Sequence, residues 1–126
     1  MTRDSIFYTG TVPIRVKRAY EAAAKGDGKR YLVDRVWPRG LRKDAIAIDA
    51  WLKELGPSTE LRKWFGHEPA RWGEFKKRYF EELESKEALW GPIRSAARER
   101  TVTLVYSARD QEHNQAVALR EFLDSR

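Results

Sequence analysis

The chain has 126 residues, of which 41% are hydrophobic and 35% charged, with no cysteine and a formal net charge of +6. These values are typical of one globular domain over residues 1–126, and they argue against disorder. Without cysteine there is no disulfide, thiolate nucleophile or cysteine-ligated zinc site. No apolar run approaches the roughly 20 residues that span a bilayer, and the apolar stretch after Met1–Ser5 is too short for a signal peptide, so we expect a cytoplasmic protein without membrane contact.

Positive charge is concentrated in residues 13–43. This segment holds ten basic side chains against three acidic ones, a net charge of +7, so the rest of the chain is close to neutral. A basic segment favours acidic partners, namely nucleic acid, nucleotides, and phosphorylated or carboxylated metabolites. The alternative is that some of these side chains only solvate an edge strand, which applies most to Lys25, Lys29 and Arg30 beside the Gly26-Asp27-Gly28 turn.

The first half of the chain predicts two strands followed by two helices. Alternation of apolar and basic residues indicates a half-exposed strand, and the apolar run after the glycine turn indicates a second one. Apolar residues at helical spacing then precede a Gly-Pro stop and a Ser-Thr start. The expected elements are strands over 13–20 and 30–36, a helix over 44–55, and a short helix from Ser58 or Thr59 to Gly66.

The second half predicts three helices and one fully buried strand. Aromatic and aliphatic residues recur at helical spacing over 72–83, and a Gly-Pro pair predicts a new helix from Pro92 to about Arg100. The β-branched run over 101–106 is typical of a strand buried on both faces of a parallel sheet, and a closing helix follows. We therefore expect an α/β fold, a small, mostly parallel sheet flanked by helices. The predicted core contains Val33, Trp51, Leu61, Phe75, Phe80, Leu83, Leu104, Val105, Leu119 and Leu123.

The loop after the strand over 30–36 carries the first set of candidate site residues. An apolar strand changes abruptly here to a segment with two arginines, a carboxylate, a tryptophan and a Pro-Gly breaker. A plain turn needs no guanidinium or large aromatic, whereas a loop that recognises an anion uses both. The ligand-binding candidates are Arg35, Trp37 and Arg39, and Asp34 is a candidate catalytic acid or base.

A second polar loop follows the strand over 101–106. In open α/β sheets ligands bind beyond the carboxyl ends of strands, where helix N-termini offer N–H groups to anions. If this strand and the strand over 30–36 are parallel neighbours, their terminal loops meet. The second loop then adds Ser107 and Arg109 as ligand-binding residues and Asp110 and His113 as candidate catalytic acids or bases.

Some of these residues have other interpretations. Asp34 has a structural alternative, in which it bridges an arginine and orders the loop. His67 is a secondary site candidate, although its Gly66-His67-Glu68-Pro69 context is also that of a helix-to-helix corner. Asp110 and His113 with Asp34 could form a metal site, but the pair is a weak signal, and we predict no metal or cofactor.

Three segments resemble signature blocks of the bacterial YeaO-like proteins: residues 34–40, 57–72 and 106–114. The resemblance covers roughly residues 13–124, with the blocks in matching order. The family belongs to a larger group of domains of unknown function, so the resemblance implies an α/β fold and no established reaction. More distant relatives place cysteine and a His-Arg pair after the last strand, where this chain has Asn114, Gln115 and Ala116, so the resemblance implies neither a thiol nor a metal mechanism for it.

Three functions stay open at the level of sequence. The favoured one is binding of a small anion, with or without its chemical processing, because the arginines converge from two strand ends. The second is a nucleic-acid-binding module in which the basic segment follows a phosphate backbone and Trp37 stacks on a base. The third is a protein-interaction module with Trp37 as its anchor.

Overall fold

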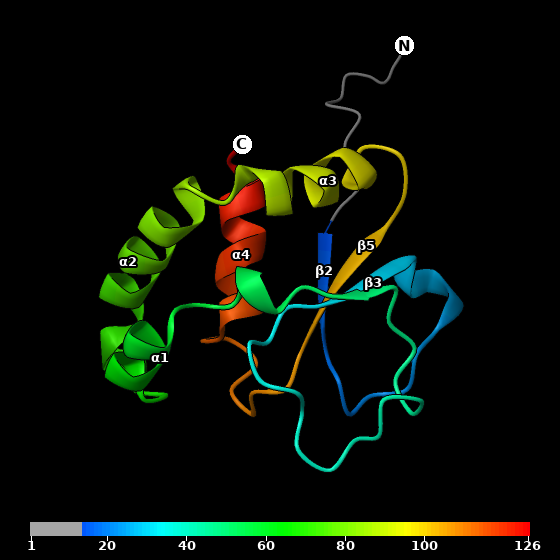
Figure 1. The fold of residues 1–126 in the computed structure, drawn as a ribbon, viewed down its shortest axis with the longest axis horizontal. Coiled ribbons are helices and arrows are strands. Elements are labelled where there is room, and N and C mark those ends of the chain that lie inside the picture. Colours follow the sequence, from blue (N-terminus) through cyan, green and yellow to red (C-terminus); the bar gives the residue numbers. More distant parts are fainter. Residues whose placement is uncertain (1–13) are drawn as a thin grey trace.

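The computed structural model describes residues 14–126, which form a parallel sheet with helices packed mainly on one face (Figure 1). The strands are β2 (Ile14–Arg18), β3 (Lys29–Leu32), β4 (Ala50–Trp51) and β5 (Val102–Tyr106), in the spatial order β2-β5-β3-β4. The helices are α1 (Thr59–Phe65), α2 (Trp72–Glu84), α3 (Glu87–Ala97) and α4 (Gln115–Asp124). Short 3₁₀ turns lie at Lys25–Asp27, Lys53–Leu55 and Pro69–Arg71. The predicted α/β class is confirmed.

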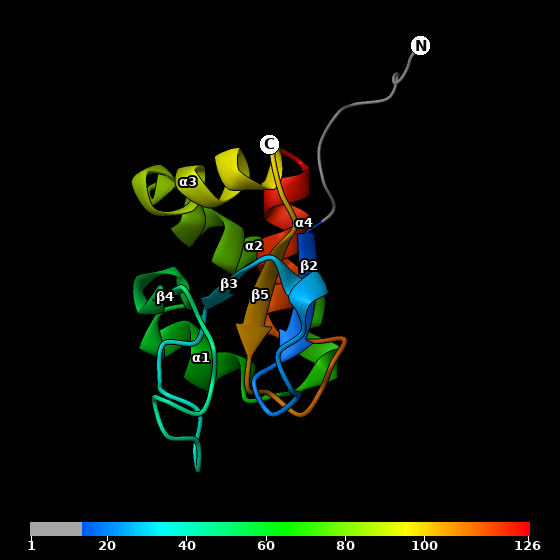
Figure 2. The ribbon, with the colours of Figure 1, turned by 90° about the vertical axis from the view of Figure 1, so that its right-hand side faces the viewer.

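Strand β5 is the interior strand that the sequence predicted. It pairs in parallel with β2 on one side and β3 on the other, and all five of its residues are buried (Figure 2). Because side chains alternate along a strand, Leu104 and Tyr106 join the cluster under the helices, while Val105 points to the opposite face. A strand covered on both faces needs a nearly continuous apolar sequence, which explains the run over 101–106.

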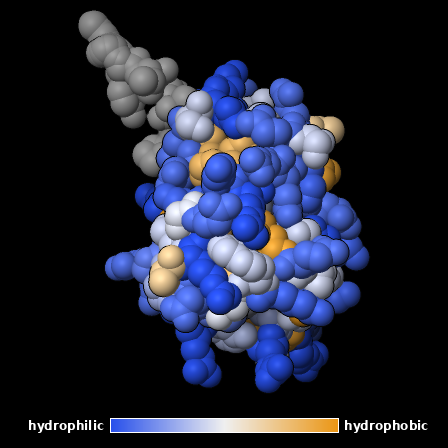
Figure 3. Space-filling view, turned by 90° about the vertical axis from the view of Figure 1, so that its left-hand side faces the viewer, coloured by the Kyte–Doolittle hydropathy of each residue, from blue (hydrophilic) through white to orange (hydrophobic). Residues whose placement is uncertain are grey.

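The two faces of the sheet are covered differently. The larger apolar cluster combines the sheet with residues of all four helices. The smaller cluster, on the other face, is covered by the irregular segment 37–48, whose Ile46 is buried against Leu32 and Val105. The surface on the side of α1 and α2 is mainly hydrophilic, with small apolar areas (Figure 3). No helix within residues 14–126 is both long and apolar enough to cross a membrane.

The predicted helix over 44–55 is wrong. This stretch is irregular apart from β4 and the 3₁₀ turn at Lys53–Leu55. The Asp49 carboxylate accepts a hydrogen bond from the Arg30 backbone N–H at 2.8 Å, and Asp49 N–H donates to Arg30 O at 2.7 Å. Pairing with β3 therefore satisfies the backbone polar groups, and the apolar residues that suggested a helix pack on the sheet instead.

The start of the predicted helix at Pro92 is also wrong, because α3 begins at Glu87 and contains Pro92 in its interior. Trp90 fixes the first turn: it is buried, donates from Nε1 to Leu83 O at 2.8 Å and contacts the Phe122 ring. This anchoring compensates for the hydrogen bond that a proline removes.

The remaining elements agree with the patterns. Ser58 caps α1 by accepting from Leu61 N–H, and α1 ends at Gly66, which has a positive φ of 55°. The strand predicted over 30–36 ends as regular structure at Leu32, although Val33 N–H still donates to Val105 O. The predicted core is buried except for Trp51 and Phe80, which are half-buried and pack against it.

Candidate functional site

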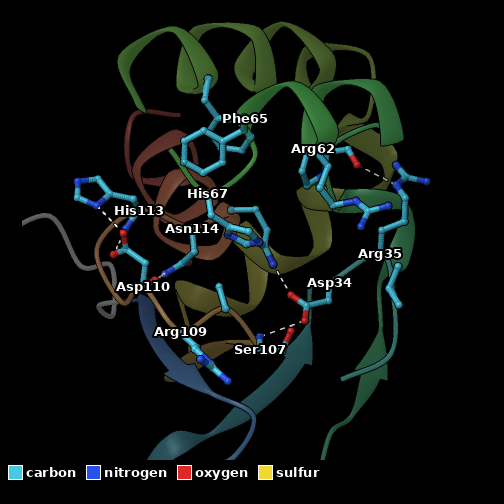
Figure 4. Close-up of a pocket in the computed structure, with 15 residues that line it drawn as sticks. Asp34, Arg35, Arg62, Phe65, His67, Ser107, Arg109, Asp110, His113 and Asn114 are labelled. Atoms are coloured by element: carbon cyan, nitrogen blue, oxygen red, sulfur yellow. Dashed lines mark hydrogen bonds and ion pairs between the residues drawn. The ribbon is translucent and has the colours of Figure 1, made fainter. Parts of the chain in front are cut away.

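A cavity of about 520 Å³ lies where the chain leaves β3 and β5 (Figure 4). The two strands are parallel neighbours, with Leu32 opposite Val105, so the loops that follow them meet as predicted. Seven of the predicted site residues line the cavity: Asp34, Arg35, His67, Ser107, Arg109, Asp110 and His113. The lining also contains residues that the sequence analysis did not select: Val36, Pro57, Arg62, Phe65, Phe75, Ala108, Asn114 and Gln115.

Asp34 is buried in the wall of the cavity, with 6% of its surface exposed. One carboxylate oxygen accepts from Ser107 N–H at 3.0 Å, and the other accepts from the Gln115 side-chain amide. Burial raises the pKa of this carboxyl above its usual range, although the hydrogen bonds from Ser107 and Gln115 and the charge of Arg62 act against the rise. Asp34 thus joins the loop after β3 to the loop after β5 and to α4, and its partners are amides instead of the arginine that the structural alternative proposed.

Arg35 uses its guanidinium to hold the backbone. Its Nε and Nη2 donate to Pro57 O at 2.9 Å and Gly56 O at 2.8 Å, and Nη1 lies 3.5 Å from a Glu54 carboxylate oxygen. The backbone segments at Arg35 and Gly56 lie close together: a Cβ added to Gly56 would be 2.9 Å from the Arg35 backbone nitrogen. Each of the three guanidinium nitrogens of Arg35 therefore contacts the segment that leads into α1.

Two other arginines line the cavity with their donors uncommitted. Among residues 14–126, the side chains of Arg62 and Arg109 make no hydrogen bond or ion pair with the protein. Arg62 comes from α1 and shares a helix face with Phe65, three residues further on. Arg62 was not among the site residues predicted from the sequence, although the short helix predicted from Ser58 or Thr59 to Gly66 contains it and was the available signal.

Trp37 and Arg39 lie outside the cavity lining. The Trp37 ring packs edge-on against Trp51, with 5.2 Å between ring centroids, and its Nε1 donates to Leu41 O at 2.6 Å. Arg39 is exposed, and its carbonyl oxygen accepts from the Tyr20 hydroxyl. After Val36 the chain turns to cover the second face of the sheet, so the structure does not bring these two candidates to the others.

Asp110 orders the second loop. One of its carboxylate oxygens accepts from the backbone N–H groups of Glu112 and His113 at 2.9 and 3.0 Å. The other lies 2.9 Å from His113 Nδ1, and these hydrogen bonds, with that from Glu112 the largest contribution, lower the pKa of Asp110. Asn114 then caps α4 by accepting from Val117 N–H. An ionised Asp110 in this arrangement orients the His113 ring, which lies nearly perpendicular to the Trp72 ring.

His67 lies at the rim of the cavity and also forms the corner after α1. It is exposed and has a positive φ of 57°, directly after the positive φ of Gly66. A left-handed conformation is uncommon for a side chain larger than glycine, although histidine adopts it more readily than most residues. His67 therefore satisfies both interpretations of the sequence, because the corner itself brings the ring to the cavity.

The lining as a whole favours a negatively charged occupant. Its three arginines exceed its two carboxylates in number, and both carboxylates accept hydrogen bonds from the protein. Within residues 14–126 no group of three histidine or acidic side chains is arranged to share a metal ion. Guanidinium donors, imidazoles and side-chain amides are among the polar groups that the lining presents.

The fold and cavity define a small α/β domain with a pocket, lined by both polar and apolar side chains, beyond the ends of two parallel strands. The family model described as the inactive DUF488-N3 subclade matches residues 13–126, and the chain belongs to this family. It is 42% identical to the uncharacterised protein YeaO of Escherichia coli K12 over 112 residues, which are 89% of this chain and 97% of YeaO. Its identity to the uncharacterised Rv3073c of Mycobacterium tuberculosis H37Rv is also 42%, over 113 residues, 90% of this chain and 95% of Rv3073c. The YeaO-like resemblance is confirmed. No solved structure matches the chain.

Proposed function

We propose that this protein binds a small anion, carrying a phosphate or carboxylate group, in the cavity beyond β3 and β5. The observation that carries the proposal is the pair of cavity-lining arginines, Arg62 and Arg109, that have no acceptor among the described residues. A guanidinium without a protein partner at the wall of a cavity offers a fork of donors that matches a phosphate or carboxylate. A cavity of about 520 Å³ lies within the usual range for small-molecule sites.

Binding without turnover is the form of the proposal that the site supports best. The carboxylates of Asp34 and Asp110 accept hydrogen bonds that hold together the loops around the cavity, which is a structural use of both side chains. The matching family is described as an inactive subclade, which agrees with a binding role. His113 is the remaining candidate for proton transfer among the three predicted catalytic residues, and its ring is oriented by Asp110.

Ligand-dependent thermal stability, followed by calorimetric titration, tests this proposal. We expect at least one anion from a panel of inorganic phosphate, nucleotides and carboxylates to stabilise the protein, by about 2.7 kcal/mol at a concentration of 100 times its dissociation constant. Loss of a charge-assisted hydrogen bond in Arg62→Gln or Arg109→Gln should weaken binding at least tenfold, or about 1.4 kcal/mol.

The matched control is Arg98→Gln, because Arg98 is exposed at the end of α3 and outside the cavity. Arg98→Gln should bind like the wild type. A further variant, Arg39→Gln, tests the arginine that the sequence predicted but that lies outside the cavity. Loss of anion binding in this variant alone would place the binding site at the loop around Arg39 and not in the cavity. The proposal fails if no anion in the panel stabilises the protein, or if the Arg62 and Arg109 variants bind as the wild type does.

A further inference from the structure

The cavity is larger than a simple anion requires. An inorganic phosphate or a carboxylate group alone would occupy a small part of about 520 Å³, and drug-sized ligands typically fill cavities of this order. The committed guanidinium of Arg35 and the buried carboxylate of Asp34 lie together with Arg62 on one part of the lining (Figure 4). A ligand that fills the remaining space has a larger molecular body attached to its acidic group.

Aromatic side chains form the wall that such a body would contact. Phe65 and Phe75 line the cavity, and their rings are stacked with centroids 4.4 Å apart. Trp72 packs against both of them, with its ring centroid 6.0 Å from that of Phe65 and 5.6 Å from that of Phe75. The rings of Trp72 and His113 are nearly perpendicular, with centroids 5.3 Å apart. The wall is thus the small exposed edge of a packed aromatic cluster, in which Phe65 exposes 6% and Phe75 2% of its surface. Because the rings hold one another in place, this edge can contact a planar ring without reorganisation.

Val36 supplies a second apolar contact, at the rim. It is 57% exposed and is one of three large hydrophobic residues that are exposed within residues 14–126, yet it lies in the lining of the cavity. Pro57, on the segment that Arg35 holds, adds a buried apolar surface nearby. An occupant that reached from Arg62 to the rim would remove the Val36 side chain from water, which is favourable in proportion to the apolar area covered.

We propose that the cavity selects an acidic group attached to a planar ring, that is, an aromatic phosphate or carboxylate. This inference rests on the proposed function and names the class of its ligand. The acidic group pairs with Arg62, and the ring packs against Phe65 and Val36. No covalent step is involved.

Matched pairs of probes isolate the ring from the acidic group. Phenyl phosphate is compared with methyl phosphate, and benzoate with acetate, by calorimetric titration of the full chain. The aromatic member of at least one pair should bind at least tenfold more tightly than its aliphatic counterpart. Arg62→Gln should lower the affinity for both members of that pair, whereas Val36→Ser should lower the affinity for the aromatic member only.

Controls separate loss of the wall from loss of the fold. Val36→Ser changes an exposed side chain, and its matched control is Leu89→Ser, an exposed leucine on α3 outside the cavity, which should bind as the wild type does. Phe65→Leu, with a thermal melt to confirm folding, should reduce the preference for the ring further. Equal binding of both members of each pair would overturn the ring inference and leave anion binding standing. Absence of binding by all four probes would overturn the ring inference, and failure of the wider anion panel would overturn anion binding itself.

Discussion

At the scale of single residues, Asp34 shows how one buried carboxylate can connect the segments that form a cavity. Both of its oxygens accept from amide groups, one on the loop after β5 and one on α4, and its backbone oxygen accepts from Trp51 Nε1 at 2.7 Å. One side chain thereby links the two loops that form the cavity. The same burial that makes the link rigid also penalises the negative charge, since desolvation is the largest contribution to its raised pKa.

We predict that Asp34→Asn gains stability relative to the wild type as pH rises. The pKa of Asp34 is raised above 3.8 in the folded protein, so its ionised form is disfavoured there. The free energy of unfolding of the wild type therefore loses about 1.36 kcal/mol for each unit of that elevation as pH passes from 3.8 through the raised pKa. Asparagine does not titrate. Its side-chain oxygen can still accept from Ser107 N–H, and its NH₂ group can donate to the Gln115 side-chain oxygen once the Gln115 amide is flipped.

Urea unfolding of both proteins between about pH 3 and pH 7 measures this difference, and comparison of the two cancels the contributions of other carboxylates. The difference in unfolding free energy should move in favour of Asp34→Asn with rising pH. A difference that is independent of pH, or that moves in favour of the wild type, would show that Asp34 is not destabilised by its charge.

At the scale of elements, the corner after α1 couples a backbone conformation to the cavity. Gly66 and His67 both have positive φ, and Pro69 follows in the next turn. Glycine adopts this conformation freely, whereas another residue pays for it. We therefore expect the corner to accept glycine at position 67. A histidine there has two explanations: it adopts a positive φ more readily than most residues, or its ring binds a ligand in the cavity.

We predict that His67→Gly is more stable than His67→Ala, by about 1 kcal/mol, because alanine is the less favourable residue at positive φ. Thermal or urea unfolding measures this order. Both variants remove the imidazole, so an anion that uses it should bind both more weakly and to the same degree. If alanine proves as stable as glycine, the corner relaxes to another conformation, and unchanged anion affinity in both would assign His67 to the corner alone.

Elements with a local signal were predictable from the sequence. The Ser58 cap, the Gly66 end and the buried run of β5 each depend on a few neighbouring residues. The irregular segment after Gly40 was not predictable, because apolar residues at helical spacing can equally well cover a sheet. Hydrogen bonds between Asp49 and Arg30, distant in sequence, decide between the two.

The candidate site follows the same division. Residues directly after β3 and β5 were brought together, since parallel neighbours end at the same edge of a sheet. Arg39 was predicted to join the other site residues but lies outside the cavity, because the chain changes direction after Val36. No local sequence pattern indicates that change of direction. Arg62 was missed because it reaches the cavity through the packing of α1, which is a tertiary property.

At the scale of the whole molecule, much of the basic segment is used internally. Arg18 donates to Ser107 O and Ala108 O, and Arg15 donates to Gly26 O. Lys17 and Arg30 both pair with the buried Asp27, and Arg30, 5% exposed, does not solvate an edge strand. Guanidinium and ammonium groups that hold backbone carbonyls and a buried carboxylate have fewer donors free to bind phosphates.

We therefore predict weak, shallowly salt-dependent binding to nucleic acid, despite the net charge of +7 in residues 13–43. Fluorescence polarisation with single- and double-stranded oligonucleotides, between about 50 and 200 mM salt, measures the slope of log affinity against log salt. A surface that tracks a backbone through 6–10 phosphates loses roughly 10³–10⁵ in affinity over this range. We expect a far smaller loss, since Arg15, Lys17 and Arg30 are engaged within the fold. The double variant Lys25→Gln and Lys43→Gln removes two exposed basic groups that make no ion pair among the described residues, and it should weaken what binding remains. A steep slope in the wild type would contradict the internal use of the segment and favour a nucleic-acid-binding protein.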